Sequence, residues 1–262
     1  MKIIDLTKEH EPLYFKCLED WSPEMAESGC HKQCWFERMR TSARVKLAAD
    51  DDGNVGGMIQ YVPIEESFAE GHGLYFVLCV WVHGYKEGRG NFQKKGMGKA
   101  LLKAAEEDAR SLGAKGLAAW GISLPFWMRA SWFRKQGYEV ADKDKQRGRI
   151  LLWKRFSDDA KPPKWEKPKK KPSGVPGKVT VTGFNSGWCP AGSITFERAK
   201  RASSEFGDKV LFRHIDTSDR SIFMEWGIDN AVFIDDTEIT TGPPLTYEKI
   251  KKKIGKKVWK LK

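Results

Sequence analysis

The feature that most constrains the fold is a segment rich in proline and lysine. Residues 161–178 read KPPKWEKPKKKPSGVPGK, with five prolines and seven lysines. Because proline lacks a backbone N–H and has a fixed φ, this segment forms neither a helix nor an interior strand. Repulsion between the lysines favours an extended chain of about 3.1 Å per residue. We therefore predict domains at residues 1–156 and 178–262, joined by a linker at residues 157–177.

Composition indicates folded domains that lie outside membranes. The chain has 262 residues, of which 40% are hydrophobic, and its 11 tryptophans and 14 phenylalanines argue against disorder. The longest apolar run, residues 74–82, is one strand long and too short to span a membrane. The N-terminus becomes charged after four residues, unlike a signal peptide. We expect a soluble, cytoplasmic protein with no membrane partner.

The five cysteines indicate free thiols. They are Cys17, Cys30, Cys34, Cys79 and Cys189, and their odd number and irregular spacing do not fit a disulfide framework. On a helix, Cys30 and Cys34 share one face and could supply two thiolates to a metal. No second ligand pair follows at the usual spacing, so we predict no metal site. Partial burial on an amphipathic helix explains the pair, and a place in a substrate pocket stays open.

The net charge of +11 is unevenly distributed. Residues 249–262 hold eight lysines and no acidic residue, whereas residues 179–248 carry an excess of acidic residues. A basic protein suggests a nucleic-acid partner. Here the excess lies in the linker and the C-terminal tail, with no basic face rich in aromatic residues between them. We expect solvated lysines that aid solubility and no nucleic-acid partner, with another anionic partner as the alternative.

Hydrophobic periodicity predicts the elements of the first domain. Their order is strand, two helices, three strands, helix, strand, helix and two strands. A hydroxyl followed by proline, at Ser22 and Pro23, begins one of the helices. The strands are predicted at residues 2–6, 45–48, 55–61, 74–82, 116–120, 138–140 and 150–153, and two later helices at residues 98–112 and 125–136.

The second domain alternates strands and helices. Its strands are predicted at residues 179–184, 210–215, 231–234 and 238–240. Its helices are predicted at residues 191–206, 221–226 and 246–254. This alternation indicates a partly parallel sheet, so both domains belong to a mixed α/β class.

A glycine-rich loop between a buried strand and an amphipathic helix is the most informative motif. Its glycines let a ligand approach the backbone, and the helix N-terminus presents N–H groups and the positive end of its dipole. Three lysines add positive charge, and this combination suits a pyrophosphate. The loop consists of Gln93, Lys94, Lys95, Gly96, Met97, Gly98 and Lys99.

Two common nucleotide motifs do not fit this loop. A P-loop needs glycine and a hydroxyl where this chain has Gln93 and Ala100. A dinucleotide-binding fingerprint needs a third glycine at Gln93, after Gly88 and Gly90. The pattern Gln/Arg-x-x-Gly-x-Gly/Ala instead resembles the loop with which GNAT acetyltransferases bind the pyrophosphate of acetyl-CoA. The preceding apolar strand and the element order of the first domain match as well, with a chance glycine-rich turn as the alternative.

The resemblance implies an acyl-CoA N-acyltransferase fold with acetyl-CoA as co-substrate and an amine as acceptor. It implies that the strand ending at Val80, Trp81 and Val82 separates from its neighbour near residues 116–120. The freed N–H groups would then bind the pantetheine arm, while amides of residues 94–99 hold the pyrophosphate. Many members have a tyrosine that protonates the leaving thiolate where this chain has Phe133.

Few residues near that strand could transfer protons. Cys79 and His83 flank the last three residues of the strand, and either could face the thioester. A core thiol and a loop histidine are the alternative interpretations. Tyr75 and His72 are weaker candidates. Residues 84–91 lengthen the usual link between strand and loop, either as a lid over the cofactor or as a surface insertion.

The start of the second domain resembles thioredoxin. Trp188 and Cys189 match the first half of the Trp-Cys-x-x-Cys site, and a cysteine at a helix N-terminus has its thiolate favoured. Gly192 takes the place of the second cysteine, and residues 227–232 lack the usual proline. We therefore expect a single thiol that senses redox state or binds a partner. The combination of domains resembles the two-domain acetyltransferases of the YoaP type.

These features favour an acetyl-CoA-dependent N-acetyltransferase with a thioredoxin-like accessory domain. An acyl-CoA-binding adaptor without turnover is one alternative, which the phenylalanine at position 133 favours. A monothiol redox module is the other. The acceptor stays open among small molecules, peptide termini and lysine side chains, and the sequence predicts no oligomeric state.

Overall fold

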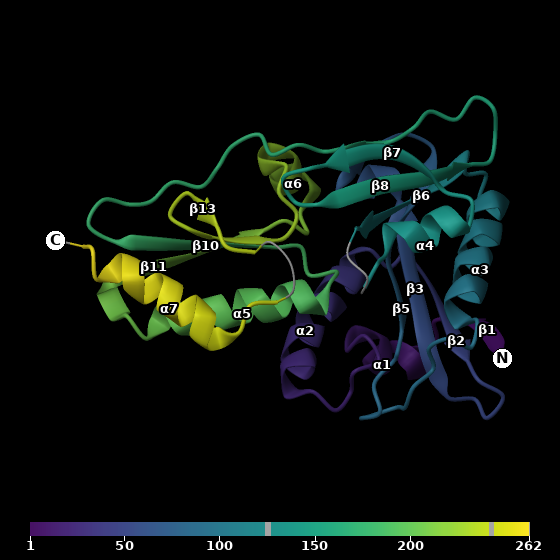
Figure 1. Ribbon diagram of the computed structural model, residues 1–262, viewed down its shortest axis with the longest axis horizontal. Coiled ribbons are helices and arrows are strands. Elements are labelled where there is room, and N and C mark those ends of the chain that lie inside the picture. The colour runs from purple at the N-terminus through teal and green to yellow at the C-terminus, as the bar shows by residue number, and fades with distance from the viewer. Residues whose placement is uncertain (124–126, 241–243, 262) are drawn as a thin grey trace. The chain divides into compact units, whose positions relative to one another are not determined.

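The computed structural model describes residues 1–123, 127–240 and 244–261. The chain divides into two compact units, which we describe separately. The first consists of Met1–Pro23 and Arg38–Glu166, and the second of Glu24–Glu37 and Lys167–Lys262. Figure 1 shows the elements of both units along the chain.

The first unit is built on a seven-stranded sheet with the order β1-β2-β3-β5-β6-β8-β7. Only β5 and β6 are parallel, and every other neighbouring pair is antiparallel. Strands β2 and β3, both predicted from the sequence, pair antiparallel and form a hairpin. The strands are β1 (Lys2–Asp5), β2 (Arg44–Ala49), β3 (Val55–Pro63), β5 (Leu74–Val82), β6 (Gly116–Ile122), β7 (Glu139–Asp144) and β8 (Arg149–Arg155).

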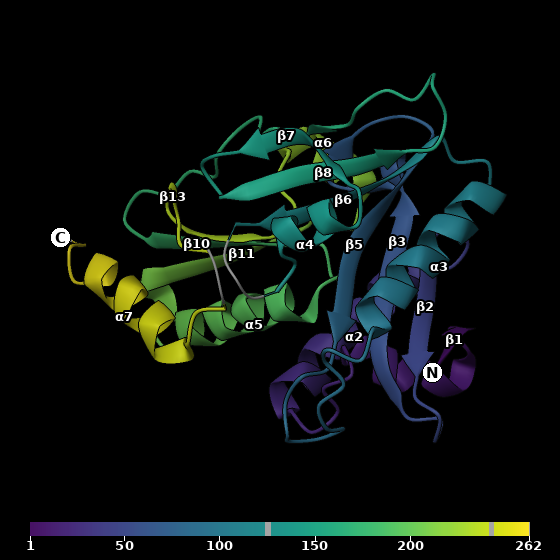
Figure 2. The same cartoon turned by 45° about the vertical axis from the view of Figure 1, so that its right-hand side comes forward.

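Helix α3 (Met97–Ser111) packs along β2, β3 and β5, as both ribbon views show (Figures 1 and 2). Its buried side chains include Leu101, Ala105 and Ala109, which follow helical spacing as the sequence predicts. Gly113, with a φ of 78°, follows the helix in the left-handed conformation that glycine tolerates best. The short helix α1 (Glu11–Phe15) and two 3-10 turns (Lys8–His10 and Ile64–Glu66) complete the N-terminal half of the unit.

Helix α4 (Ala130–Lys135) is shorter than the helix predicted at residues 125–136. Met128 has a φ of 49°, and Arg129 is extended, so neither residue can continue a right-handed helix. The Met128 carbonyl accepts a hydrogen bond from the Ile122 N–H at 2.8 Å, which folds this segment back on β6. Residues 125 and 126 of the predicted helix lie outside the described residues.

The predicted linker is hydrogen-bonded at both ends. Within the first unit, β9 (Lys164–Trp165) pairs with β4 (Ala69–Glu70), and the Trp165 ring stacks on Phe68 at 6.0 Å. Within the second unit, the Lys169 N–H donates to the Trp226 carbonyl at 2.9 Å. The segment forms no helix, as its prolines require.

The second unit contains a four-stranded sheet with the order β11-β10-β12-β13. Strands β10 and β11 are parallel, while β12 is antiparallel to both β10 and β13, so the expectation of a partly parallel sheet is confirmed. The strands are β10 (Val179–Asn185), β11 (Val210–Asp216), β12 (Ala231–Ile234) and β13 (Thr237–Glu238).

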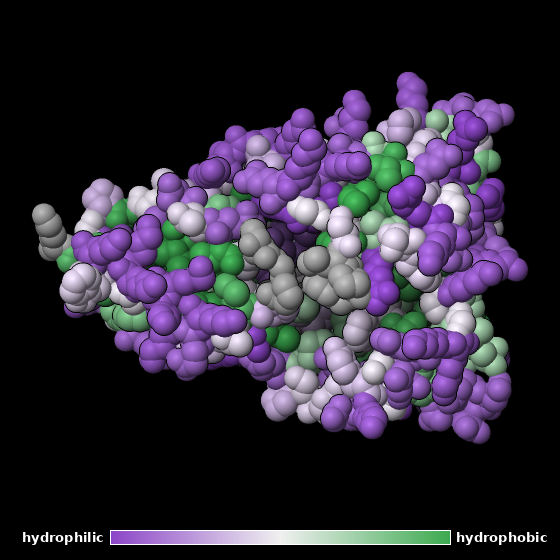
Figure 3. All heavy atoms as spheres, viewed as in Figure 1, coloured by the Kyte–Doolittle hydropathy of each residue, from purple (hydrophilic) through white to green (hydrophobic). Residues whose placement is uncertain are grey.

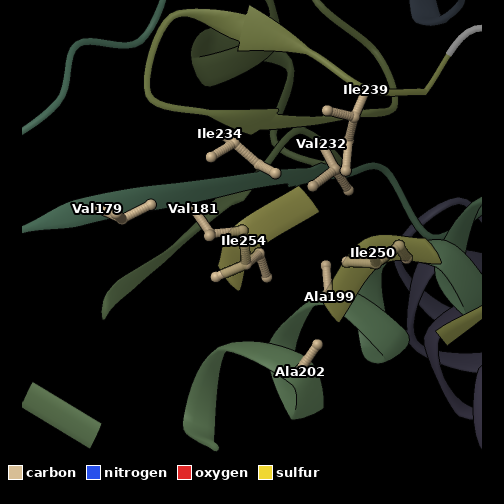
Figure 4. Packing of buried hydrophobic residues seen from close by; sticks show 9 residues of the cluster. All are labelled: Val179, Val181, Ala199, Ala202, Val232, Ile234, Ile239, Ile250 and Ile254. Carbon is tan, nitrogen blue, oxygen red and sulfur yellow. The ribbon is translucent and has the colours of Figure 1, made fainter. Parts of the chain in front are cut away.

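Helices α5 (Pro190–Ser204) and α7 (Tyr247–Val258) cover this sheet, and α6 (Arg220–Trp226) packs on β11. Figure 4 shows the hydrophobic core that α5 and α7 form with β10 and β12. Small side chains on α5 let the helix approach the sheet, and branched side chains from the strands and α7 fill the space. The core residues are Val179, Val181, Ala199, Ala202, Val232, Ile234, Ile239, Ile250 and Ile254.

Helix α2 (Pro23–Arg38) packs within the second unit, although the sequence pattern assigned it to the first domain. Glu24 accepts hydrogen bonds from the Arg198 guanidinium at 2.7 and 2.5 Å. Glu27 accepts two from Arg201 at 2.8 and 2.7 Å. Both contacts join α2 to α5. The Arg198 contact is two-pronged, through Nε and Nη2, and such forked geometry fixes orientation as well as adding attraction, whereas Arg201 donates to Glu27 through Nη1 alone.

The exposed face drawn in Figure 3 is mostly hydrophilic, with hydrophobic side chains gathered in small groups. Among the described residues, no helix is both long enough and apolar enough to cross a membrane.

A carboxylate on α3 ties the helix to β2 and β3. Asp108 accepts hydrogen bonds from Arg44 at 3.0 and 2.9 Å and from the Tyr61 hydroxyl at 2.7 Å, and Lys46 Nζ lies 3.4 Å away. Burial alone would raise the pKa of Asp108, but these hydrogen bonds and charges outweigh burial and lower it. The ionised carboxylate therefore stabilises the fold.

We expect Asp108→Asn to lower the free energy of unfolding at neutral pH by about 1–3 kcal/mol, because it leaves the buried Tyr61 hydroxyl and the partly exposed Arg44 guanidinium poorly satisfied. Since folding lowers this pKa, the stabilisation is complete above the unfolded value of about 3.9 and is lost as the pH falls below it. Urea unfolding at several pH values measures the difference. Glu107→Gln, an exposed position on the same helix, is the control. If the difference in unfolding free energy between Asp108→Asn and the control does not change with pH, the ionised Asp108 carboxylate does not stabilise the fold.

Candidate active site

Strands β5 and β6 separate halfway along their length. Their parallel register ends where Val77 meets Ala119, although β5 continues to Val82 and β6 to Ile122. The indole N–H of Trp120 donates to the Leu78 carbonyl at 2.9 Å, just beyond the last paired residues. The end of β5 therefore has an edge that β6 does not cover.

A bulge precedes this free edge. The register between β3 and β5 shifts between Gln60 and Tyr61, which leaves Leu78 without a partner residue on β3. Beyond the strand end, the His83 N–H donates to the Gly56 carbonyl of the flanking chain at 2.9 Å. Because successive N–H groups along a strand alternate in direction, those of Val82 and Val80 point away from β3.

A sulfur atom lies beside one of these N–H groups. Met128 Sδ is 3.5 Å from the Val80 nitrogen, and sulfur is a weak acceptor. Met128 is 5% exposed and comes from the segment that folds back on β6. The gap between β5 and β6 thus contains strand N–H groups that a stronger acceptor could engage.

The glycine-rich loop forms the N-terminus of α3. Gly96 caps the helix with a φ of 83°, and Lys94 also has a positive φ of 62°. The first helical hydrogen bond is donated by the Ala100 N–H to the Gly96 carbonyl at 3.1 Å. The N–H groups of Met97, Gly98 and Lys99 therefore have no acceptor within the helix, and they lie at its positive end.

The loop adjoins the free edge of β5. A Cβ on Gly98 would lie 3.5 Å from Trp132 and 3.7 Å from Val82, so the helix start, α4 and the end of β5 are neighbours. A Cβ on Gly96 would meet no atom within 4 Å, so the space above it is open. The structure thus brings together the predicted loop and the predicted strand end.

His83 is buried directly after this strand end. It is 0% exposed, and its Nδ1 lies 2.6 Å from the Gly90 carbonyl oxygen. Because a carbonyl only accepts, Nδ1 must carry the proton, and the neutral ring then has a lone pair on Nε2. Nε2 is buried and has no hydrogen-bond partner among the described residues.

Two side chains that the sequence pattern did not indicate, Trp21 and Tyr85, lie beside His83. The Trp21 ring lies 4.9 Å from the His83 ring, and the Tyr85 ring lies 5.6 Å from it. Glu19 lies within electrostatic range of His83, and burial raises the pKa of this carboxyl. The unusual length of residues 84–91 was the one sequence signal that pointed to these side chains, because Tyr85 belongs to this segment and Gly88 packs on Trp21.

The other candidates for proton transfer are placed differently. Cys79 is 5% exposed and lies opposite Gln60, which accepts a hydrogen bond from the Tyr14 hydroxyl at 2.7 Å. Tyr75 lies in the paired half of β5. His72 is exposed and lies 3.2 Å from a carboxylate oxygen of Glu65.

Phe133 is completely buried in α4. Its ring makes edge contacts with Trp132 at 4.9 Å and Tyr138 at 5.6 Å. Burial raises the pKa of Tyr138 well above its usual value, so this phenol stays protonated. Position 133, where the resemblance implies a proton donor, is therefore part of the hydrophobic core.

The cysteine of the second unit stands at the start of a helix. Cys189 is the N-cap of α5, is partly exposed and precedes a proline at the first helical position. The neighbouring Trp188 is buried, and its indole N–H lies 3.2 and 3.3 Å from the Asp229 carboxylate oxygens. A Cβ on Gly192 would lie 3.4 Å from Asn230. The Asn230 side chain therefore faces Gly192, which stands where the Trp-Cys-x-x-Cys motif has its second cysteine.

Helix α2 contacts the loop before this thiol. A Cβ on Gly187 would lie 2.8 Å from the His31 carbonyl, and His31 Nε2 lies 2.8 Å from Glu197 Oε1. Cys30 and Cys34, the metal candidates on this helix, are both exposed. Within the described residues, no three side chains of ligating type form a cluster.

The tautomer of His83 can be tested directly. We expect ¹⁵N-edited NMR at neutral pH to show a proton on Nδ1 and none on Nε2, because Gly90 supplies an acceptor only at Nδ1. Exposed His72 is the internal comparison, since its ring is free to exchange with solvent. A protonated Nε2 with a bare Nδ1 would contradict the geometry.

Several solved structures are similar to this chain. A GNAT-family protein from Desulfovibrio desulfuricans is 18% identical and covers 60% of this chain and 99% of its own, with a TM-score of 0.46. A ribosomal-protein-alanine N-acetyltransferase from Brucella melitensis is 21% identical over 60% of this chain and 100% of its own, with a TM-score of 0.44. The PaiA N-acetyltransferase of Thermoplasma acidophilum, solved with coenzyme A, is 18% identical over the same shares, with a TM-score of 0.43.

No curated protein matches this chain significantly. The family model described as "Acetyltransferase (GNAT) family" matches residues 4–138, which is more than half of the chain. That range contains the separated strands, the glycine-rich loop and His83. The chain therefore belongs to the GNAT family of acetyltransferases.

Proposed function

We propose that the first unit binds acetyl-CoA along the free edge of β5 and transfers its acetyl group to an amine. The observation that carries this proposal is the end of β5–β6 pairing at Val77, five residues before β5 itself ends. In an ordinary sheet the N–H groups of Val80 and Val82 would be used by β6. Here they are directed into the gap, where carbonyl groups of a pantetheine arm can accept from them.

The pyrophosphate would bind at the start of α3. Phosphate oxygens accept hydrogen bonds from free N–H groups at a helix N-terminus, and the helix dipole adds attraction. Each such charge-assisted bond contributes about 1.5–3 kcal/mol. The proposed contacts are Gln93, Lys94, Lys95, Gly96, Met97, Gly98 and Lys99 for the pyrophosphate, and Val80, Trp81 and Val82 for the pantetheine.

The chemistry is a direct transfer between bound partners. The amine nitrogen attacks the thioester carbonyl, a C–N bond forms, and the carbonyl oxygen becomes an oxyanion. A strand N–H such as that of Val80 stabilises this negative charge. The C–S bond then breaks, and the products are the N-acetylated amine, coenzyme A and one proton.

His83 is the proposed base. A protonated amine has no lone pair for the attack, so a base must first take its proton. The Nε2 lone pair of His83 is buried and has no partner among the described residues, so it is available to accept this proton. Cys79 is the second candidate, and its burial beside Tyr14 makes it the weaker one.

The leaving thiolate needs little assistance. Phe133 cannot supply a proton, and it does not reach the surface. A thiol has a pKa of about 8.5, so the thiolate leaves more readily than an alkoxide and can take its proton from water. The buried phenylalanine also fits the competing function, an acyl-CoA-binding protein without turnover.

For the second unit we propose a thioredoxin-like domain with one thiol. The strand order β11-β10-β12-β13 supports this, because the parallel pair β11–β10 at one edge is extended by two antiparallel strands. Cys189 at the N-cap of α5 is in the position of a reactive thiol. Together with the acetyltransferase domain, this arrangement fits the two-domain YoaP type.

A pair of glycine variants tests the cofactor site. Gly96 and Gly113 flank α3, have φ values of 83° and 78°, and both face open space. Replacing either with tryptophan imposes similar backbone strain. We expect Gly96→Trp to weaken acetyl-CoA binding about 100-fold or more in calorimetry, because phosphate can no longer approach, while Gly113→Trp binds normally. Equal affinities for two folded variants would overturn the assignment of this loop.

Labelling rates test the thiol of the second unit. We expect iodoacetamide to alkylate Cys189 at neutral pH faster than the other four cysteines, because the helix N-terminus favours its thiolate. Cys30 and Cys34 are the informative comparison, since both are more exposed than Cys189. If either of them reacts faster in mass spectrometry, exposure controls the rate and the thiol is not activated.

A further inference from the structure

Four rings gather at the end of β5 and form an aromatic cluster of Trp21, Trp81, His83 and Tyr85. The Trp21 ring centre lies 4.9 Å from His83 and 6.4 Å from Tyr85. The Tyr85 ring lies 5.6 Å from His83 and 6.2 Å from Trp81. Trp81 comes from the free edge of β5, His83 and Tyr85 come from the chain that follows it, and Trp21 comes from the connection after α1.

The aromatic cluster extends from the surface to the interior. Trp21 and Tyr85 are 39% and 48% exposed, whereas His83 is fully buried. Two polar atoms inside the cluster, Trp81 Nε1 and His83 Nε2, are buried without a hydrogen-bond partner among the described residues. Buried polar groups are almost always paired, so an unpaired indole donor and an unpaired imidazole acceptor in one cluster, each against the Tyr85 ring, indicate a ligand.

The rings are held in place before any ligand binds. A Cβ on Gly88 would lie 2.2 Å from the Trp21 ring, so the chain after β5 packs directly against this side chain. Arg89 fixes that chain, because its guanidinium donates to the Val55 carbonyl at 2.9 Å. A depression of about 440 Å³, lined by Asp20, Trp21, Asn54, Gly88 and Arg89, shares Trp21 with the aromatic cluster, and its volume suits a small molecule.

One acidic side chain accompanies the rings. Glu19 is half-buried and lies within electrostatic range of both His83 and Tyr85. The next residue, Asp20, lies 3.4 Å from the Arg89 guanidinium and is compensated by it. Glu19 can therefore balance one positive charge of a ligand.

From these contacts we propose that the aromatic cluster binds the acceptor as a small organic monocation, a primary ammonium on an apolar or aromatic carbon skeleton. Ring faces attract ammonium groups, and Trp does so best. Glu19 balances the charge, and His83 Nε2 accepts one proton from the ammonium, which leaves the neutral amine beside Val82. This inference rests on the proposed acetyl transfer and names its substrate class.

Phenethylamine is the probe, and 2-phenylethanol is its uncharged analogue. Calorimetry on the full chain saturated with coenzyme A gives both dissociation constants. We expect the amine to bind at least about tenfold more tightly than the alcohol, because only the amine is attracted to the rings and to Glu19. Spermidine and a lysine-containing peptide serve as competitors, and both are expected to bind more weakly than phenethylamine.

Variants of Trp21 isolate the contribution of the ring. We expect Trp21→Leu to weaken phenethylamine binding about fivefold, while Trp21→Phe, which keeps an aromatic face, stays within about twofold of the parent. Glu19→Gln should weaken it by about tenfold. Trp259→Leu, at an 88% exposed position of the second unit, and Glu107→Gln are the matched controls.

Three results would overturn the inference: equal binding of amine and alcohol, equal effects of Trp21→Leu and Trp21→Phe, or tighter binding of spermidine or the peptide. Titration of acetyl-CoA into each protein separates this failure from failure of the proposed function. Loss of amine selectivity with normal acetyl-CoA binding rejects only the aromatic site. Absence of acetyl-CoA binding by the unmodified chain rejects the transfer reaction itself.

Discussion

The separation of two parallel strands is the constraint on which the functional interpretation depends. Backbone N–H groups in a sheet are normally used by the neighbouring strand, and exposing them is costly unless a ligand or water pairs with them. In this unit the cost is confined to the end of β5. There the Trp120 indole donates to the Leu78 carbonyl, and the Met128 sulfur lies against the Val80 N–H. The glycine-rich loop, the helix dipole of α3 and His83 all converge on this free edge.

Sequence patterns predicted the local features well because their causes are local. The loop at residues 93–99 is recognisable from glycine spacing, and α3 from its apolar stripe, which ends one residue earlier than predicted. The separation of β5 from β6 came only from family resemblance, since periodicity carries no information about pairing. The late start of α4 depends on the positive φ of Met128, which no composition rule predicts.

Long-range contacts account for what the sequence did not reveal. Trp21 and His83 are 62 positions apart in the printed sequence, and only folding places their rings 4.9 Å apart. Helix α2 lies within the residues that match the family model, yet its carboxylates pair with arginines of α5, 174 positions away. The periodicity of α2 identifies a helix but does not show that it packs on α5. A domain boundary placed at the proline-rich segment therefore assigned α2 to the first domain.

Amide chemical shifts during an acetyl-CoA titration show directly whether the cofactor binds at the free edge of β5. We expect the N–H signals of Val80 and Val82 to move and become protected from hydrogen exchange, together with those of residues 94–99. The signals of Phe76 and Val77, on the paired half of the same strand, should stay in place. Saturable binding that leaves Val80 and Val82 unchanged would show that the free edge of β5 is not where the cofactor binds.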